Sequence, residues 1–327
     1  MARFLARRLL DHALVLLVAA SCGYLLAATA LDPRGNYTGP GSSTPPHVVE
    51  SMLREYNLSD RVPLAQRYVT WVGGVVTGDF GQTWDGREVA GELARRIGVS
   101  ARLLAVGFLG AAVTGVFLGA WTGARRGGVL DTVVTLGSFV LISVPTVVVA
   151  VSLQTAALWF NAAVGVDVLR TTGEFTPGVD TTSWAGAADR ARHLVLPTLA
   201  LALPMIALYS RYQRALMIDE ADADYVRTAR AKGRTRGAAL FRHALPMALL
   251  PTVTYIGYSA ALVFVGSVFV EKVFGWHGVG ELLVDSIARG DVNTVAAVCC
   301  FGALCVAVAG LLADVAQMTL DPRLRVR

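Results

Sequence analysis

Charged side chains are scarce in this sequence. Asp, Glu, Lys and Arg make up 16% of its 327 residues, whereas 54% are hydrophobic. Soluble domains carry about a quarter charged residues, so this composition argues against a soluble protein. An apolar helix needs roughly 20 residues to cross about 30 Å of hydrocarbon, and several apolar runs reach that length. The sequence therefore predicts an all-α polytopic membrane protein.

Motifs of nucleotide-binding and hydrolytic enzymes are missing. The sequence has no Gly-x-x-x-x-Gly-Lys-Ser/Thr segment, and its two lysines, Lys232 and Lys272, lie in no such loop. Without that loop the chain is not expected to cradle ATP phosphates. His-Glu-x-x-His and Gly-x-Ser-x-Gly are also missing, which disfavours an intramembrane hydrolase. We predict a chain that is not an enzyme, with any nucleotide-driven motor on another polypeptide.

Cysteine is rare as well. Cys22, Cys299, Cys300 and Cys305 all fall inside apolar runs, and their spacing matches neither a zinc site nor a redox pair. No metal or other cofactor is predicted on this chain. The residues before Cys22 resemble a lipoprotein cleavage site, but the apolar run continues to Leu31, beyond the length of a signal-peptide core. An uncleaved first span is therefore favoured.

Six apolar runs are long enough to be membrane spans. They are Ala13–Leu31, Val99–Trp121, Thr132–Phe160, Leu194–Ile218, Met247–Val270 and Val292–Ala316. Prolines inside these runs each remove one backbone hydrogen bond, so kinks along a pathway and ordinary packing irregularities both remain open interpretations. These prolines are Pro145, Pro197, Pro204 and Pro251.

If the N-terminus is cytoplasmic, the arginines on that side are Arg3, Arg7, Arg8, Arg125, Arg126, the cluster from Arg211 to Arg242, and Arg323, Arg325 and Arg327. That side then carries 16 basic and 8 acidic residues, whereas the other side carries 13 basic and 16 acidic residues. Six spans place both termini on one side, and the positive-inside rule makes that side the cytoplasm. Topology and lipid headgroups explain the positive charge, so no nucleic acid partner is predicted.

Three regions follow from this pattern: residues 1–31 with the first span, a polar segment at residues 32–98, and residues 99–327 with the other five spans. In the polar segment, apolar residues at helical spacing predict helices near Val49, over Leu64–Val76 and from Arg87 onward. The segment is interpreted as a small helical cap on the outer mouth. A second outer loop, residues 161–193, is expected to contain at most a short helix.

The polar loop between the fourth and fifth runs, residues 219–246, is the most informative segment. Acidic residues begin it, basic residues follow as far as Lys232, and Gly233 comes next. This order complements the dipole of a water-exposed helix and ends that helix with a residue suited to left-handed geometry. A second short helix is predicted over residues 235–245, which makes the loop a helix-turn-helix element.

Tyr225, Val226 and Ala229 form a narrow apolar edge on the first of these helices. An edge of this size is suited to docking in the groove of a partner protein. The alternative is a helix that lies flat on the membrane surface with its arginines on lipid phosphates. Residue order favours docking. The run Asp224-Tyr225-Val226-Arg227-Thr228-Ala229-Arg230-Ala231-Lys232-Gly233 resembles the loop of the permease subunits of ATP-binding-cassette importers, in their dipeptide/oligopeptide branch (the DppB/OppB type).

The resemblance rests on two motifs and extends over nearly the whole chain. The ATPase-docking motif of that branch is similar to Asp224, Tyr225, Val226, Arg227, Thr228, Ala229, Arg230, Ala231, Lys232 and Gly233, followed by His243. Its extracytoplasmic loop motif is similar to the segment that contains Glu271, Phe274, Gly278 and Gly280, with Asp291 beyond it. Weaker matches lie at residues 57–64, 78–81 and 320–323.

This resemblance implies a type I importer permease fold and a set of partners. A second homologous permease subunit would complete the pathway, and one or two cytosolic ATPase subunits would bind ATP and Mg²⁺ and grip the loop. An extracytoplasmic binding protein would deliver di- or oligopeptides across a bacterial inner membrane. Relatives of the same architecture carry nickel chelates or glutathione, and the sequence does not separate these substrates.

An ion-coupled secondary transporter is the other class to be weighed. Such transporters carry ionisable residues at mid-membrane. Here Asp314 lies near the end of a run, and Arg211 and Arg214 lie close to the predicted cytoplasmic exit. The sequence shows no proton or sodium relay, so Asp314 is interpreted as an interfacial or inter-subunit contact.

Overall fold

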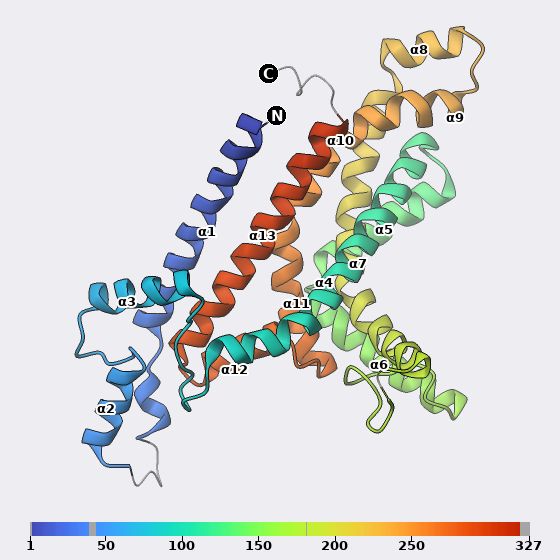
Figure 1. Cartoon of the computed structure of the whole chain (residues 1–327). Coiled ribbons are helices and arrows are strands. Elements are labelled where there is room, and N and C mark those ends of the chain that lie inside the picture. The colour runs from blue at the N-terminus through green and yellow to red at the C-terminus, as the bar shows by residue number, and fades with distance from the viewer. Residues whose placement is uncertain (1, 39–43, 181, 321–327) are drawn as a thin grey trace. The chain divides into compact units, whose positions relative to one another are not determined.

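The computed structural model describes residues 2–38, 44–180 and 182–320, and these residues are predominantly helical (Figure 1). The chain forms two compact units. The N-terminal unit contains Phe4–Arg102 and Trp276–Ala307, and the core unit contains residues 2–3, 103–275 and 308–320 of the described chain. Helices α4 and α13 run from one unit into the other.

The N-terminal unit is built mainly from α1, three short helices and parts of two long ones. Its elements are α1 (Ala2–Ala30), the 3-10 turn η1 (Pro33–Asn36), α2 (Pro46–Glu55), α3 (Leu64–Thr77), the start of α4 (Val89–Ala124), α12 (Val279–Ala288) and the start of α13 (Val292–Leu320). Its hydrophobic core joins α1, α2, α3 and α13 through Tyr24, Leu53, Trp71 and Val295. The indole of Trp71 stacks on the ring of Tyr24 with centroids 4.5 Å apart.

The core unit contains the rest of α4 and α13 and the helices between them. These are α5 (Val129–Ser143), α6 (Thr146–Val164), α7 (Trp184–Ala221), α8 (Asp224–Ala231), α9 (Arg236–Ala239), the π-helical turn η2 (Leu240–Ala244), α10 (Leu245–Tyr258) and α11 (Ala260–Phe274). Helices α8 and α9 lie at one end of this unit and α6 lies at the other (Figure 1).

Five helices of the described residues are long and apolar enough to cross a membrane, and the bent pair α10–α11 makes a sixth if it is one span. This count agrees with the predicted six spans, but two spans are not the single helices expected. Thr132–Phe160 is α5 and α6, separated at Val144 and Pro145. Val144 is extended, with φ −97° and ψ 125°, because the residue before a proline is driven out of the helical region.

The fifth predicted span is also two helices. Helices α10 and α11 meet at Ser259 with a bend of 47°. The bounds predicted for the second outer loop, residues 161–193, were wrong at both ends. Helix α6 extends to Val164 and α7 begins at Trp184, so helix occupies both ends of that segment. Helix α12 was not predicted, since only its beginning lies inside the motif that was interpreted as a loop. Helices α2 and α3 agree with prediction to within a few residues.

Close packing of α4 against α7 depends on glycines that share one face of α4. A methyl group added at Gly115 would lie 2.7 Å from Cβ of Tyr209, and one added at Gly123 would lie 2.7 Å from Cβ of Met217. Gly107 approaches Leu201 in the same way, at 2.8 Å. Because contacts this short exclude any side chain, the small residues set the distance between the two helices.

Replacing Gly115 with leucine should therefore destabilise the protein by about 1–3 kcal/mol, the usual cost of overpacking. Gly110→Leu is the matched control, because Gly110 is on the same helix and a Cβ there meets nothing within 4 Å. Thermal unfolding of the purified, detergent-solubilised chain measures the difference. Equal melting temperatures for the two variants would show that the α4–α7 contact is not this close.

Candidate functional site

An apolar cluster holds the loop 219–246 against the last turns of α4 and α7 in the core unit. Val226 and Ala229 of α8, 1% and 8% exposed, pack with Met217 of α7, Leu240 of η2 and Ala124 of α4. Ala239, Ala244 and Ala248 belong to the same cluster. The loop is therefore a folded extension of α7 and α10.

This packing corrects one expectation about α8. The predicted apolar edge was to be presented to a partner, but Val226 and Ala229 face the chain's own core. The physical reason is that α8 is held within reach of the apolar ends of α4 and α7, where burying these side chains removes them from water. Of the three residues of that edge, only Tyr225 stays exposed, at 40%.

The outward surface of α8 is polar and mostly basic. Arg227, Thr228, Arg230, Ala231 and Lys232 are exposed, and so is Asp224 at its start. Arg227 forms an exposed ion pair of 3.5 Å with Asp224, and such a pair holds neither side chain strongly. The arginines and Lys232 are thus accessible for contact with another protein.

Tyr225 anchors the first turn of α8 to the end of α7. Its phenolic hydroxyl donates a hydrogen bond to the Glu220 carboxylate. Burial, together with this carboxylate, raises the pKa of Tyr225, so the tyrosine stays a hydrogen-bond donor at physiological pH. The loop therefore begins with a fixed geometry.

Gly233 ends α8 with the left-handed geometry predicted from the sequence. Its φ is +88°, its N–H donates to the Arg230 carbonyl at 2.9 Å, and the N–H of Arg234 donates to the Ala229 carbonyl at 3.3 Å. This pattern satisfies carbonyls that a helix end would otherwise leave without partners. A Cβ at Gly233 meets nothing within 4 Å, so backbone conformation alone favours glycine here.

The second half of the loop runs without a break into the membrane helix. The Thr235 side chain caps α9 by accepting from the N–H of Ala238 at 3.4 Å. The residues predicted as one short helix, 235–245, form α9 and the π-helical turn η2, which continues into α10. His243 lies in η2 and is half-buried. A π-helical turn commonly marks a functional segment.

The second predicted motif is divided between the two units. Glu271 and Phe274, at the end of α11 in the core unit, are 0% and 1% exposed. The Phe274 carbonyl accepts from Gly173 N–H at 2.8 Å, which fastens the loop after α6 to the end of α11. Gly278 and Gly280, at the start of α12, belong to the N-terminal unit. The predicted match at 321–323 lies outside the described residues.

Asp291, also in the N-terminal unit, organises the beginning of α13. Its carboxylate accepts from the Trp84 N–H at 3.2 Å and from the Thr294 hydroxyl at 2.8 Å. Burial raises the pKa of Asp291 above its ordinary value. Asn293 donates to the carbonyls of Tyr56 and Gln82, both at 2.9 Å. Trp84 and Asn293 were missed by sequence reasoning, because neither stands in a motif.

The segment 32–98 is held to α1 by a buried arginine. Arg67 on α3 is 7% exposed and donates to the carbonyl of Leu58 at 3.2 Å and to that of Ala28, in the last turn of α1, at 3.3 Å. An arginine with several donors satisfies helix-terminal carbonyls that have no partner within the helix. The segment is therefore an integral part of the N-terminal unit.

Glu50 is the centre of an ion-pair network in the same segment. Its carboxylate accepts from Ser59 at 2.6 Å, Arg34 at 2.5 Å and Arg54 at 3.1 Å. Arg34 also pairs with Asp60. The hydrogen bond from Ser59 and those from the arginines lower the pKa of Glu50 to about 2.

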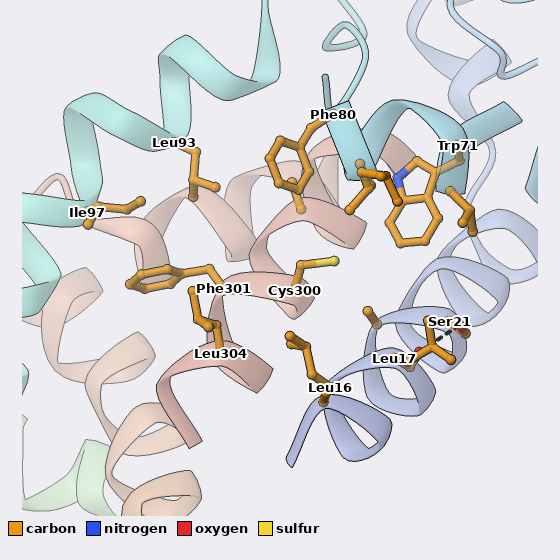
Figure 2. A pocket seen from close by; sticks show the side chains of 16 residues that line it. Leu16, Leu17, Ser21, Trp71, Phe80, Leu93, Ile97, Cys300, Phe301 and Leu304 are labelled. Carbon is orange, nitrogen blue, oxygen red and sulfur yellow. Dashed lines mark hydrogen bonds between the residues drawn. The ribbon is translucent and has the colours of Figure 1, made fainter. Parts of the chain in front are cut away.

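An apolar cavity of about 420 Å³ lies in the N-terminal unit, between α1, α3, α4 and α13 (Figure 2). Leu16, Trp71, Leu93 and Phe301 are among the residues that line it. The hydroxyl of Ser21, at its edge, already bonds the carbonyl of Leu17 and the hydroxyl of Tyr68, both at 2.7 Å. The cavity has no charged lining residue. Among the described residues, no group of three or more His, Cys, Asp or Glu could hold a metal ion.

Comparison with known proteins defines the class. Residues 115–326 match the family model described as "Binding-protein-dependent transport system inner membrane component". The chain is 45% identical over 326 residues to the oligopeptide transport system permease protein OppB of Mycobacterium tuberculosis, a match that covers 100% of both chains. It is 33% identical over 281 residues to AppB of Bacillus subtilis, covering 84% of both, and 29% identical over 327 residues to OppB of Salmonella typhimurium, covering 99% of this chain and 100% of that one.

This chain belongs to the family of inner membrane components of binding-protein-dependent transport systems. It is thus a multi-pass inner membrane permease subunit and not an enzyme. Such a system includes an ATPase, which binds the nucleotide, and a binding protein. The resemblance stated from the motifs at 224–233 and 271–280 is confirmed, and the secondary-transporter and hydrolase interpretations are set aside.

Gly233→Val should loosen α8, because a β-branched residue at φ +88° is strained by about 1–3 kcal/mol. Gly233→Asn is the matched control, since asparagine tolerates left-handed geometry. Limited trypsin digestion in membranes measures the change through cleavage after Arg227, Arg230 and Lys232. Faster cleavage is expected for the valine variant alone, and equal rates in both would contradict a role for backbone conformation.

Glu50 should contribute stability that depends on pH. Its ordinary pKa of 4.5 is lowered to about 2 in the folded chain, so the contribution is complete above the higher value and is lost as pH falls toward the lower one. Glu50→Gln removes it at every pH. The melting temperature of the native chain should exceed that of Glu50→Gln at neutral pH, and the difference should shrink below about pH 4.

Glu55→Gln is the control for that experiment. Glu55 lies on the same helix and forms no ion pair within the described part of the chain. Its substitution should leave the pH dependence unchanged. A Glu50→Gln curve parallel to the native one from neutral to acid pH would refute the network.

Proposed function

We propose that this chain is one of two homologous permease subunits that together form the translocation pathway of an ATP-driven oligopeptide importer. We further propose that loop 219–246 is the element that docks on the ATPase, with its exposed residues making the contact. The observation that carries the proposal is the two-sided construction of α8, which is apolar toward its own chain and basic toward the outside.

The construction of α8 suits a part that transmits force. Its inner side is joined to α4, α7 and η2 by buried side chains. A displacement of α8 therefore also displaces the membrane helices. Its outer side offers Arg227, Arg230 and Lys232, which can form charge-assisted hydrogen bonds with acidic side chains of a partner. Val226 and Ala229 would act by holding the helix in place.

The substrate proposal rests on the relatives. OppB of Mycobacterium tuberculosis, which aligns over its full length, and AppB of Bacillus subtilis are both oligopeptide transport system permease proteins. A similar full-length relative of that kind favours peptides over nickel chelates or glutathione. Choice among peptides would lie largely with the binding protein that delivers them.

Topology and pairing complete the proposal. Both termini would be cytoplasmic, because the arginine-rich ends and the loop 219–246 would then lie on the positive side. Glu271, Phe274, Gly278, Gly280 and Asp291 would lie toward the outer face, where the buried motif residues support the mouth of the pathway. The second permease would cover apolar helix surface that this chain leaves exposed, such as Phe117 and Leu136 at 59% and 60%.

Reversing the charge of Arg227 and Arg230 together, to glutamate, should weaken binding of the ATPase at least about tenfold, since truncating or reversing interfacial charge pairs costs more than 1.4 kcal/mol. Co-purification of the ATPase with the membrane complex measures this, and uptake of a labelled peptide into cells should fall in parallel. The protein should remain in the membrane at native levels, because neither side chain is buried.

Arg192→Glu is the matched control for this charge reversal. Arg192 is an exposed arginine in the first third of α7, at the end of that helix remote from the loop. It should keep full ATPase association. If the double variant retains the ATPase as well, the outward side of α8 is not the docking surface.

A further inference from the structure

Helices α7 and α10, the two stems of the loop 219–246, are joined side by side by two hydrogen bonds between side chains. The hydroxyls of Tyr209 and Ser259 lie 2.6 Å apart, and the Thr252 hydroxyl lies 2.5 Å from Oε1 of Gln213. Tyr209, Gln213 and Thr252 are 0% exposed and Ser259 is 5% exposed. We call these two pairs the α7–α10 clasp.

Opening the clasp costs free energy, because its hydrogen bonds are buried. Each of its polar groups is surrounded by apolar helix, where a donor or acceptor without a partner loses about 1–3 kcal/mol. Gln213 Nε2 has no hydrogen-bond partner among the described residues, so Thr252 supplies the only hydrogen bond that the amide makes there. The rings of Tyr212 and Tyr255 stack with centroids 4.4 Å apart and add an aromatic contact to the same seam. These interactions hold the two stems together along their length.

Both stems are weakened at one end of the clasp, on α7 before Tyr209 and on the other stem at Ser259 itself. On α7, Pro204 precedes Tyr209, and a proline at that position deprives the Ala200 carbonyl of its helical partner. On the other stem, α10 ends at Tyr258 and the chain bends by 47° at Ser259. The Ser259 N–H is shared between the carbonyls of Tyr255 and Ile256, which is a loosened helical pattern. Sharp bends in helices occur at such sites.

The far side of the bend is packed against other helices. Around Gly266 on α11, a Cβ would lie 3.2 Å from Leu201 of α7 and 3.7 Å from Thr146 of α6. The near side is packed against the loop, through the cluster that contains Met217, Leu240 and Ala248. It is also packed against α4, at Gly115 and Tyr209, and against α5, through the ion pair of Arg214 with Asp131. The near side and the far side of the bend therefore have different neighbours, and the weakened positions lie between them.

We infer that the loop 219–246, the α7 segment after Pro204 and helix α10, together with the parts of α4 and α5 packed on them, move as one rigid lever, which pivots at Pro204 and Ser259 and is kept rigid by the α7–α10 clasp. This inference rests on the proposed function, because it takes the loop to be the point where force is applied. Tyr209, Gln213, Thr252 and Ser259 are positioning residues in this device. Without the clasp, a pull on α8 would separate the stems and would not tilt them.

Distances measured by spin labels in the complete reconstituted transporter test the lever. Labels are attached to cysteines at exposed positions in a background where the four native cysteines of this chain are replaced. One pair, Thr228 and Tyr258, lies within the lever, and the other, Thr228 and Val265, reaches across the bend. On ATP binding, the first distance should stay constant while the second changes. A change in the first as large as that in the second, or no change in the second, would overturn the lever.

A clasp-free variant tests the four side chains. Tyr209→Phe, Ser259→Ala, Gln213→Met and Thr252→Val remove both partners of each hydrogen bond, which is nearly neutral for stability. The Thr228–Tyr258 distance should now change with ATP, and peptide taken up per ATP hydrolysed should fall at least about fivefold while hydrolysis continues. An unchanged distance and an unchanged ratio would refute the role of the clasp.

Ser267→Ala with Thr254→Val is the matched control. Thr254 lies on α10 and Ser267 on α11, and among the described residues each hydroxyl bonds only a carbonyl of its own helix, that of Leu250 and that of Phe264. This control should keep the native distances and the native uptake per ATP. Failure of the proposed function would be seen separately, as absence of peptide uptake or of ATPase association in the native complex, whereas the two spin-label distances report on the lever without a transported substrate.

Discussion

The rest of the core unit depends on the contact of α8 with η2 and with the last turns of α4 and α7. It buries Val226 and Ala229, two small apolar side chains on an otherwise polar helix. The free energy of burying two such side chains is modest, yet the contact determines which side of α8 faces outward. Because the apolar side is used internally, everything that α8 offers to another molecule is polar or charged.

The same principle, small residues that permit close packing, recurs in the membrane helices. Gly115 and Gly123 allow α4 to approach α7, and α7 in turn is held to α10 by the clasp. Lipid provides no hydrophobic force between apolar helices, so packing and buried hydrogen bonds must provide their association. The core unit is accordingly closely packed where its helices carry glycine or paired polar groups, and is bent where proline or Ser259 interrupts a helix.

In the N-terminal unit, charged and polar side chains join the elements. In its segment 32–98, Arg67 and Glu50 bond carbonyls and side chains from several elements. Asp291 and Asn293 play the same part at the start of α13. The segment is thereby joined to two long helices, α1 and α13.

Several elements could be predicted because their causes are local. Helices α2 and α3 follow from apolar spacing, and the left-handed end of α8 follows from Gly233 after a run of basic residues. The break at Val144 was not predicted, since a proline inside a membrane span can also lie in a continuous helix, as Pro197 and Pro204 do in α7. The bend at Ser259 has no proline and no glycine at its centre, so the local sequence did not predict it.

The sequence by itself determined the class of protein, the number of apolar spans and the position of the polar loop, because composition, hydrophobic run length and residue order act over short distances along the chain. Only the tertiary structure decided that Val226 and Ala229 face inward, that Gln213 pairs with Thr252, and that Arg67 reaches the end of α1. Those outcomes depend on which surfaces the folded helices bring together. The local sequence around a residue does not indicate which distant residues will contact it.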